Sequence, residues 1–222
     1  MTAENKIVIR LGLTQIPAAI AALDLYFRMH LGQYDAIDQL YHESTDKLWD
    51  HDVDRARDML MARIRNALMP DIAQLAFSGS RGIYNELNDP KCMDAYNLMC
   101  SVRRSWALHR NPHPSFMEAT VDYREPTGKG RFRPAECVID ENGAVITMLQ
   151  GQYEIFIEAA SVYYDVLSLN LHRAFSRFTD DPELLKLAKE AEKYHPSDLP
   201  EDMVTRAQNL HDTIKDQTNT YE

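Results

Sequence analysis

The segment Ile16-Pro-Ala-Ala-Ile-Ala-Ala-Leu-Asp-Leu-Tyr-Phe-Arg-Met-His30 begins a regular pattern that continues to Tyr41. Spacings of 4, 3, 4, 3, 4, 3 and 4 separate Ile16, Ile20, Leu23, Phe27, His30, Tyr34, Ile37 and Tyr41. This period predicts an α-helix that packs along its whole length. We expect Thr14 to cap the helix and Pro17 to lie in its first turn. Gly32 is the one weak point, where the helix bends or breaks.

The rest of the chain is also mainly helical, with a short β region in the middle. Predicted helices cover residues 14–41, 52–69, 89–110, 152–178, 183–194 and 201–215. Lys6–Leu11 is predicted to be an edge strand, and Phe116–Tyr123 and Glu136–Leu149 are predicted strands, with a hairpin turn at Asp140-Glu-Asn-Gly143. The predicted class is α+β, mainly α-helical with a small antiparallel β-hairpin or three-stranded sheet.

The domain organisation follows from these elements and from the length of the chain. One domain is predicted over residues 1–222, because 222 residues are enough for one core and no long linker is visible. Its parts are a helical core over about 14–110, a β-hairpin over about 116–149 and C-terminal helices over about 152–217.

Composition and charge limit the kinds of function. Hydrophobic residues make up 45% of the chain and charged residues 26%, which is typical of a globular protein. There is no signal-peptide pattern and no apolar run of about 20 residues, so we expect a cytoplasmic protein with no membrane contact. The net charge of −10 argues against long nucleic acid as a partner. No cofactor motif appears, so none is predicted.

Positive charge is concentrated in one part of this acidic chain. Residues 101–135 carry seven Lys and Arg against three Asp and Glu, whereas residues 180–222 carry five against eleven. If the Gly128–Arg131 loop folds back on the third helix, its cations can form a phosphate pocket. The predicted ligand-binding residues are Arg103, Arg104, Arg110, Lys129, Arg131, Arg133 and, for stacking on a base, Trp106. The alternative is a solvated charged face.

An alternative catalytic site is suggested by Arg104 and His109, whose spacing fits the R-x4-6-H pattern of HEPN-like, metal-independent ribonucleases. An imidazole that titrates near neutrality can move a proton while a guanidinium stabilises charge on a phosphoryl group. The spacing is common by chance. The structural interpretation is a helix C-terminus at which basic side chains complement the macrodipole.

Other candidate features have simpler structural interpretations. Asp50–Asp54, with His42 and Glu43, contains metal-binding residue types, but acidic residues also gather at helix starts, so no metal is predicted. His30 lies on the apolar stripe and is expected to be a hydrogen-bonded core histidine. The Ser78–Gly82 loop is a weak candidate for an anion-binding nest. Reduced, mostly buried thiols are expected at Cys92, Cys100 and Cys137.

Two segments carry a family resemblance: Ala22-Leu-Asp-Leu-Tyr-Phe-Arg-Met-His-Leu-Gly-Gln33 and Ala95-Tyr-Asn-Leu-Met-Cys-Ser-Val-Arg-Arg-Ser-Trp106. They resemble segments of short phage- and prophage-encoded proteins without an assigned function, over about residues 13–126. The resemblance transfers no catalytic residue. It implies a phage accessory setting, in which small proteins often bind and block host machinery.

The sequence therefore predicts a non-enzymatic binding protein. The leading hypothesis is a phage accessory or counter-defence protein that binds a host protein or sequesters a phosphorylated small ligand such as a signalling nucleotide. The alternatives are the ribonuclease that uses Arg104 and His109, and a structural phage component. A homo-oligomer is expected, formed through the helix at Ile16–Tyr41 or the helix at Tyr153–Phe178.

Overall fold

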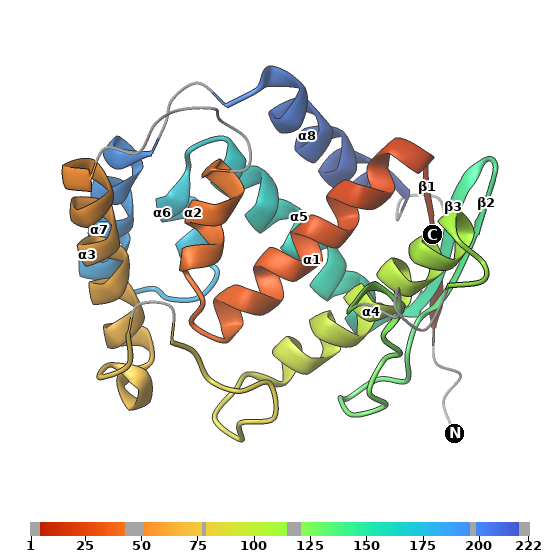
Figure 1. Ribbon diagram of the computed structural model, residues 1–222, viewed down its shortest axis with the longest axis horizontal. Helices are drawn as coiled ribbons and strands as arrows, with labels where there is room; N and C mark the ends of the chain where they lie inside the picture. Colours follow the sequence, from red (N-terminus) through yellow and green to blue (C-terminus); the bar gives the residue numbers. More distant parts are fainter. Residues whose placement is uncertain (1–4, 43–50, 77–78, 115–120, 196–198, 218–222) are drawn as a thin grey trace.

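The structure is a computed structural model that describes residues 5–42, 51–76, 79–114, 121–195 and 199–217. With η for a 3-10 turn, the elements are β1 (Lys6–Leu11), η1 (Leu13–Gln15), α1 (Ile16–His30), α2 (Asp35–His42), α3 (His51–Leu68), η2 (Pro70–Ile72), α4 (Pro90–Arg110), η4 (Val121–Tyr123), β2 (Glu136–Asp140), β3 (Gly143–Leu149), α5 (Gln150–Leu167), α6 (Leu171–Phe175), α7 (Pro182–Ala191), η5 (Glu192–Tyr194) and α8 (Glu201–Asp216). The predicted α+β, mainly helical class is confirmed. In Figure 1, α1 crosses the middle of the molecule, with the sheet at one end and the paired helices α3 and α7 at the other.

The first predicted helix is broken near its middle. Helix α1 ends at His30 and α2 begins at Asp35, and between them Gly32 has a φ of 79°, which favours glycine. A Cβ atom at Gly32 would lie 2.7 Å from the Sδ atom of Met69. The prediction that Thr14 caps the helix is wrong, because Thr14 lies inside η1, where the Gln15 side chain accepts a hydrogen bond from the Gly12 N–H at 3.0 Å.

The sheet has the strand order β1-β3-β2, with both pairs antiparallel, which confirms the edge strand and the hairpin. Its register sets Ile9 and Cys137 on either side of Ile146, on the face that packs against the helices. The prediction of a strand at Phe116–Tyr123 is wrong for Val121–Tyr123, which forms η4. The remaining part of that prediction, residues 116–120, lies outside the described residues.

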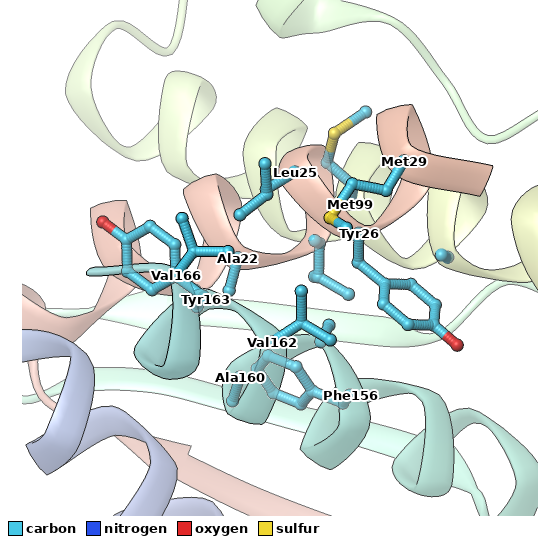
Figure 2. Packing of buried hydrophobic residues seen from close by; sticks show 14 of the residues in the cluster. Ala22, Leu25, Tyr26, Met29, Met99, Phe156, Ala160, Val162, Tyr163 and Val166 are labelled. Atoms are coloured by element: carbon cyan, nitrogen blue, oxygen red, sulfur yellow. The ribbon is translucent and has the colours of Figure 1, made fainter. Parts of the chain in front are cut away.

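The core forms where α1 packs against α4 and α5, and one cluster of buried side chains extends from β1 to α8. Figure 2 shows Ala22 and Met29 of α1 among Met99 of α4 and Phe156 and Val162 of α5. Small alanine side chains on α1 let the neighbouring helices approach closely. The predicted stripe is confirmed only in part, because Ile16 and Leu23 are buried while Ile20, Phe27 and His30 are partly exposed, and the buried face of α1 is centred on Ala19, Ala22, Tyr26 and Met29.

Both helices that were predicted to form an oligomer interface use their apolar residues inside the chain. Ile16 and Tyr41 on the first stripe and Phe156 and Ala160 on the second are 0% exposed. A homo-oligomer would need a different surface, and it stays a prediction. Among the described residues, no helix combines the length and apolar character that crossing a bilayer requires.

Candidate functional site

The predicted ligand-binding residues separate in the structure. Arg103 and Arg104 lie on the C-terminal half of α4, where their carboxylate neighbours are Asp122 at 3.9 Å and Glu125 at 3.0 Å. Arg110 is exposed at the last position of this helix. Arg103 and Arg104 thus face the 121–125 segment, whose acids balance their charge, whereas Arg110 is screened by solvent.

The two residues of the ribonuclease hypothesis also have other partners. His109 stacks on Trp106, with ring centres 5.7 Å apart and planes 13° apart, whereas Arg104 forms the ion pair with Glu125. Five residues along a helix correspond to a rotation of about 140°, so Arg104 and His109 point to different sides of α4. Arg133 lies elsewhere again, beside Gln152, which donates a hydrogen bond to its carbonyl group at 2.9 Å.

The Gly128–Arg131 loop does fold back on α4, and two buried side chains hold it there. The Asp94 carboxylate accepts hydrogen bonds from the Arg131 N–H at 2.8 Å and from its Nε–H at 2.6 Å. The Asn97 amide accepts a hydrogen bond from the Thr127 N–H at 2.9 Å and donates one to the Lys129 carbonyl. Asp94 and Asn97 are both 2% exposed. The loop is thus fixed by hydrogen bonds that water cannot easily replace.

Lys129 and Arg131 from this loop line one open pocket of about 350 Å³, here called the Lys129 pocket. The Lys129 ammonium lies 4.5 Å from the centre of the Tyr84 ring, and Tyr84 is 59% exposed. Glu86 and Asp89 from the same loop as Tyr84 also line the pocket, and balance its two cations. Tyr84 is not predictable from the sequence, because 45 residues separate it from Lys129 and no local pattern connects them.

A second pocket of about 400 Å³ lies on the other side of the Asn88–Pro90 segment and is here called the His30 pocket. Six segments meet there, which contribute among others His30, Tyr34, Met69, Lys91, Glu158 and Phe178. The break between α1 and α2 places His30 and Tyr34 in its wall. Its size is in the range of small-molecule sites.

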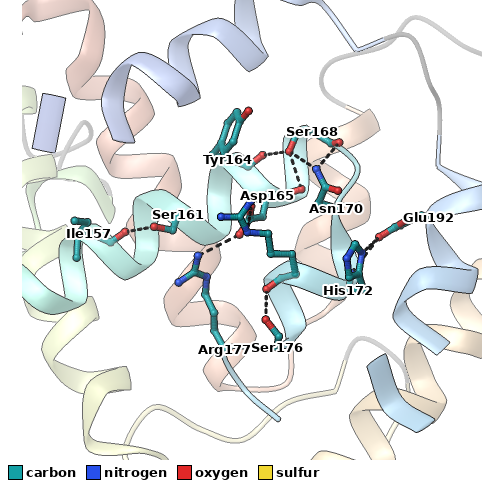
Figure 3. A network of polar contacts seen from close by, with 11 residues as sticks. Ile157, Ser161, Tyr164, Asp165, Ser168, Asn170, His172, Ser176, Arg177 and Glu192 are labelled. Atoms are coloured by element: carbon teal, nitrogen blue, oxygen red, sulfur yellow. Dashed lines mark hydrogen bonds and ion pairs between the residues drawn. The ribbon is translucent and has the colours of Figure 1, made fainter. Parts of the chain in front are cut away.

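Each cation of the His30 pocket has a carboxylate partner. Lys91 lies 2.8 Å from Glu158, and Arg81 forms a two-pronged ion pair with Asp71, whose pKa this contact lowers. Figure 3 shows Arg177 reaching the carboxylate of Asp165, at 3.3 Å. Asp165 is 1% exposed, so this pair is protected from solvent on one side. The pocket therefore has a charged rim whose charges are largely neutralised.

Three polar atoms of the His30 pocket are buried without a hydrogen-bond partner among the described residues: Tyr34 Oη, His30 Nε2 and Asn88 Oδ1. The prediction of a hydrogen-bonded core histidine is therefore wrong for this nitrogen of His30. Burial lowers the pKa of His30 to about 4, despite the opposing influence of Asp89 and Glu158. The imidazole is neutral at pH 7 and is able to donate or accept a hydrogen bond.

Ser78 of the loop proposed as an anion-binding nest lies outside the described residues, and the Gly79 carbonyl of that loop joins those of Leu75 and Ala76 around a cation. The buried Arg65 guanidinium donates to the carbonyl groups of Leu75 at 2.9 Å, Ala76 at 2.6 Å and Gly79 at 3.2 Å. The Arg81 N–H donates to the Leu31 carbonyl at 3.0 Å. These carbonyl groups thus converge because they surround the positively charged guanidinium group of Arg65.

The three thiols and the acidic residues considered as metal ligands take part in packing and in an ion pair. Cys92 and Cys100 are buried and Cys137 is partly buried, and burial raises the pKa of Cys92 to about 12 and that of Cys137 to about 11. Asp54 forms an ion pair with Arg57 at 2.9 Å. Within the part of the chain that the structure describes, no three His, Cys, Asp or Glu residues gather as metal ligands would.

No protein-family model, curated protein or solved structure matches this chain. The two pockets must therefore be interpreted from their own chemistry.

Proposed function

We propose that this chain is a binding protein for a small phosphorylated ligand, and that the Lys129 pocket holds the phosphate group. The observation that supports this most directly is the pairing of Lys129 and Arg131 in one pocket beside the exposed ring of Tyr84. A phosphate offers oxygen acceptors to both cations, and a planar base can stack on the tyrosine.

The Arg131 side chain is well placed for this role. Asp94 takes its Nε–H, which fixes the plane of the guanidinium, while 45% of the side chain remains exposed. The terminal nitrogens of an arginine held in this way can approach a phosphate in a two-pronged geometry. Lys129 adds a second, more mobile charge.

The fixed conformation of the Gly128–Arg131 loop also reduces the entropic cost of binding. Asp94 and Asn97 hold the backbone from Thr127 to Arg131 before any ligand arrives. A site whose loop is already ordered loses less conformational freedom on binding than a mobile loop would. Glu86 opposes an anion, so binding depends on the two cations outweighing it.

Isothermal titration calorimetry of the full chain with inorganic phosphate, AMP and ATP tests the proposal. We expect at least one of them to bind and Lys129→Met to weaken that binding about tenfold or more, because the ammonium contact is lost. Glu86→Gln should strengthen it. The matched control is Arg110→Gln, an exposed arginine outside the pocket, which should change nothing. Equal binding by Lys129→Met and the wild type, or no binding by any probe, would contradict the proposal.

The biological setting is part of the same proposal. A phage accessory or counter-defence role rests on the resemblance of the two segments at residues 22–33 and 95–106, and sequestering a signalling nucleotide would fit it. Ribonuclease activity is not proposed further, since Arg104 is paired with Glu125 and His109 stacks on Trp106. A structural phage component would form large assemblies, which light scattering detects.

A further inference from the structure

We propose that the His30 pocket is a second binding site, which takes an uncharged planar heterocycle with hydrogen-bond donors and acceptors along its edge, as a nucleobase has. The proposal is independent of the phosphate site, because Lys129 and Arg131 do not line this pocket. It rests on three properties of the pocket wall: its unpaired polar atoms, its balanced charge and its ring surfaces.

The first property is the set of buried polar atoms without a partner. The Tyr34 hydroxyl belongs to a side chain that is 1% exposed, and neither it nor His30 Nε2 nor Asn88 Oδ1 has a hydrogen-bond partner among the described residues. Buried polar groups in folded proteins are nearly always hydrogen-bonded, since an unpaired one is costly. All three side chains line the pocket, and rotation of each would bring a phenol, an imidazole or an amide oxygen to an occupant that both donates and accepts.

The second property is the balance of charge, which disfavours an ionic occupant. Lys91, Arg81 and Arg177 are each paired with a carboxylate of the chain. The Asp89 carboxylate accepts a hydrogen bond from the Lys91 N–H at 2.8 Å, as the N-cap of α4. An anion or a cation would have to compete with these existing pairs. A neutral molecule needs only the unpaired atoms.

The third property is the apolar and aromatic part of the wall. Phe178 and His30 line the pocket with ring centres 5.0 Å apart, and Met69 and Leu87 add aliphatic surface. A flat ring gains contact with such surfaces over its faces, while its edge meets the polar atoms. A flexible polyol would bury hydroxyl groups against these apolar side chains at a cost.

The test uses the full chain and four nucleosides: adenosine, guanosine, cytidine and uridine. Calorimetry and thermal unfolding should show binding of at least one of them with a dissociation constant below about 1 mM. Tyr34→Phe should weaken that binding about fivefold, the loss expected for one hydrogen bond of about 1 kcal/mol. Without a nucleoside, this variant should unfold at or above the wild-type temperature, because it removes a buried hydroxyl that has no partner among the described residues.

Tyr153→Phe is the matched control, since the Tyr153 hydroxyl donates to the Ile214 carbonyl at 3.2 Å in another part of the core. It should lower the unfolding midpoint by about 2–4 °C and leave nucleoside binding unchanged. His30→Asn provides a second variant in the pocket and should also weaken binding. The opposite pattern, with Tyr34→Phe destabilising and neutral for binding, would overturn the proposal.

Further outcomes separate this site from the phosphate site. Lys129→Met should leave nucleoside binding unchanged, and loss of nucleoside binding in that variant would assign it to the Lys129 pocket instead. If AMP binds tenfold more tightly than adenosine in a manner that depends on Tyr34, the pocket is an anion site and the proposal is wrong. If none of the four nucleosides binds, the pocket does not take a nucleobase and the proposal is wrong as well.

Discussion

The Lys129 pocket and the His30 pocket share the Asn88–Pro90 segment as a wall, yet they are built in opposite ways. In the first, buried Asp94 and Asn97 are fully engaged in holding a loop, and the groups offered to a ligand are exposed. In the second, the charges at the rim are paired and the groups offered to a ligand are buried. A cluster of cations in a sequence identifies only the first kind of site.

The difference also predicts how substitutions act. Groups that hold the Lys129 pocket together contribute to stability, because each completes a hydrogen bond of the folded chain. The unpaired polar atoms buried in the wall of the His30 pocket contribute little, because folding removes them from water without providing a partner. Loss of the Asp94 or Asn97 hydrogen bonds should therefore lower both the stability of the fold and the affinity for phosphate. Changes in the His30 pocket should instead alter nucleoside binding without a matching loss of stability.

The largest effect is expected for Asp94→Ala. This substitution removes both hydrogen bonds to Arg131 and leaves a cavity on α4, so the free energy of unfolding should fall by about 3 kcal/mol. Urea denaturation measures this, and phosphate binding should be lost with it while nucleoside binding at the His30 pocket persists. Asp122→Ala, which removes an exposed carboxylate 3.9 Å from Arg103, is the control and should cost less than about 0.5 kcal/mol.

A smaller effect is expected from the glycines of the same loop. Gly130 has a φ of 131°, and a Cβ there would lie 2.7 Å from Asp94 Oδ1, so Gly130→Ala should cost about 2 kcal/mol. Gly128 has a φ of 67° and open space around it, so Gly128→Ala should cost only about 1 kcal/mol. If urea denaturation gives the same loss of stability for Gly130→Ala and Gly128→Ala, a side chain at position 130 does not clash with Asp94 and this explanation is wrong.

An effect as small as those of the glycines concerns the pH dependence of the His30 pocket. Because burial lowers the pKa of His30 from 6.5 to about 4, the unfolded chain takes up the proton first as the pH falls. The stability that neutral His30 provides is present above pH 6.5 and is lost toward pH 4, by about 1–2 kcal/mol between pH 7 and pH 5.

The measurement is the difference in unfolding free energy between the wild type and His30→Asn across this range. Burial also raises the pKa of Asp38 to about 7, which gives a slope of opposite sign, but this contribution cancels in the difference. A difference that stays constant from pH 7 to pH 5 would show that His30 is solvated.

Much of the fold was predictable because its signals are local. The helical period from Ile16 onward, the Asp89-Pro90 start of α4 and the Asp140–Gly143 turn each depend on residues within one or two turns of each other. The failures have a local cause too. A 3-10 turn and a Gln15 side chain replace the expected cap at Thr14, and η4 replaces the end of a predicted strand.

The sites were less predictable. The sequence identified the return of the Gly128–Arg131 loop to the third helix as the event that would bring cations together, and the structure has that loop on α4. It did not indicate that Arg103 and Arg104 pair with Asp122 and Glu125 and stay outside the Lys129 pocket. Helical phase alone does not fix which side of a long helix a later loop will cover.

The sequence by itself determined the mainly helical class, the break at Gly32, the hairpin and the acidic charge, because each follows from periodicity, backbone preference or composition. Only the tertiary structure decided which cations share a pocket and where the atoms Tyr34 Oη, His30 Nε2 and Asn88 Oδ1 lose their access to water. Those properties depend on contacts between segments tens of residues apart. Such contacts leave no short-range pattern, since packing selects them only after the helices have formed.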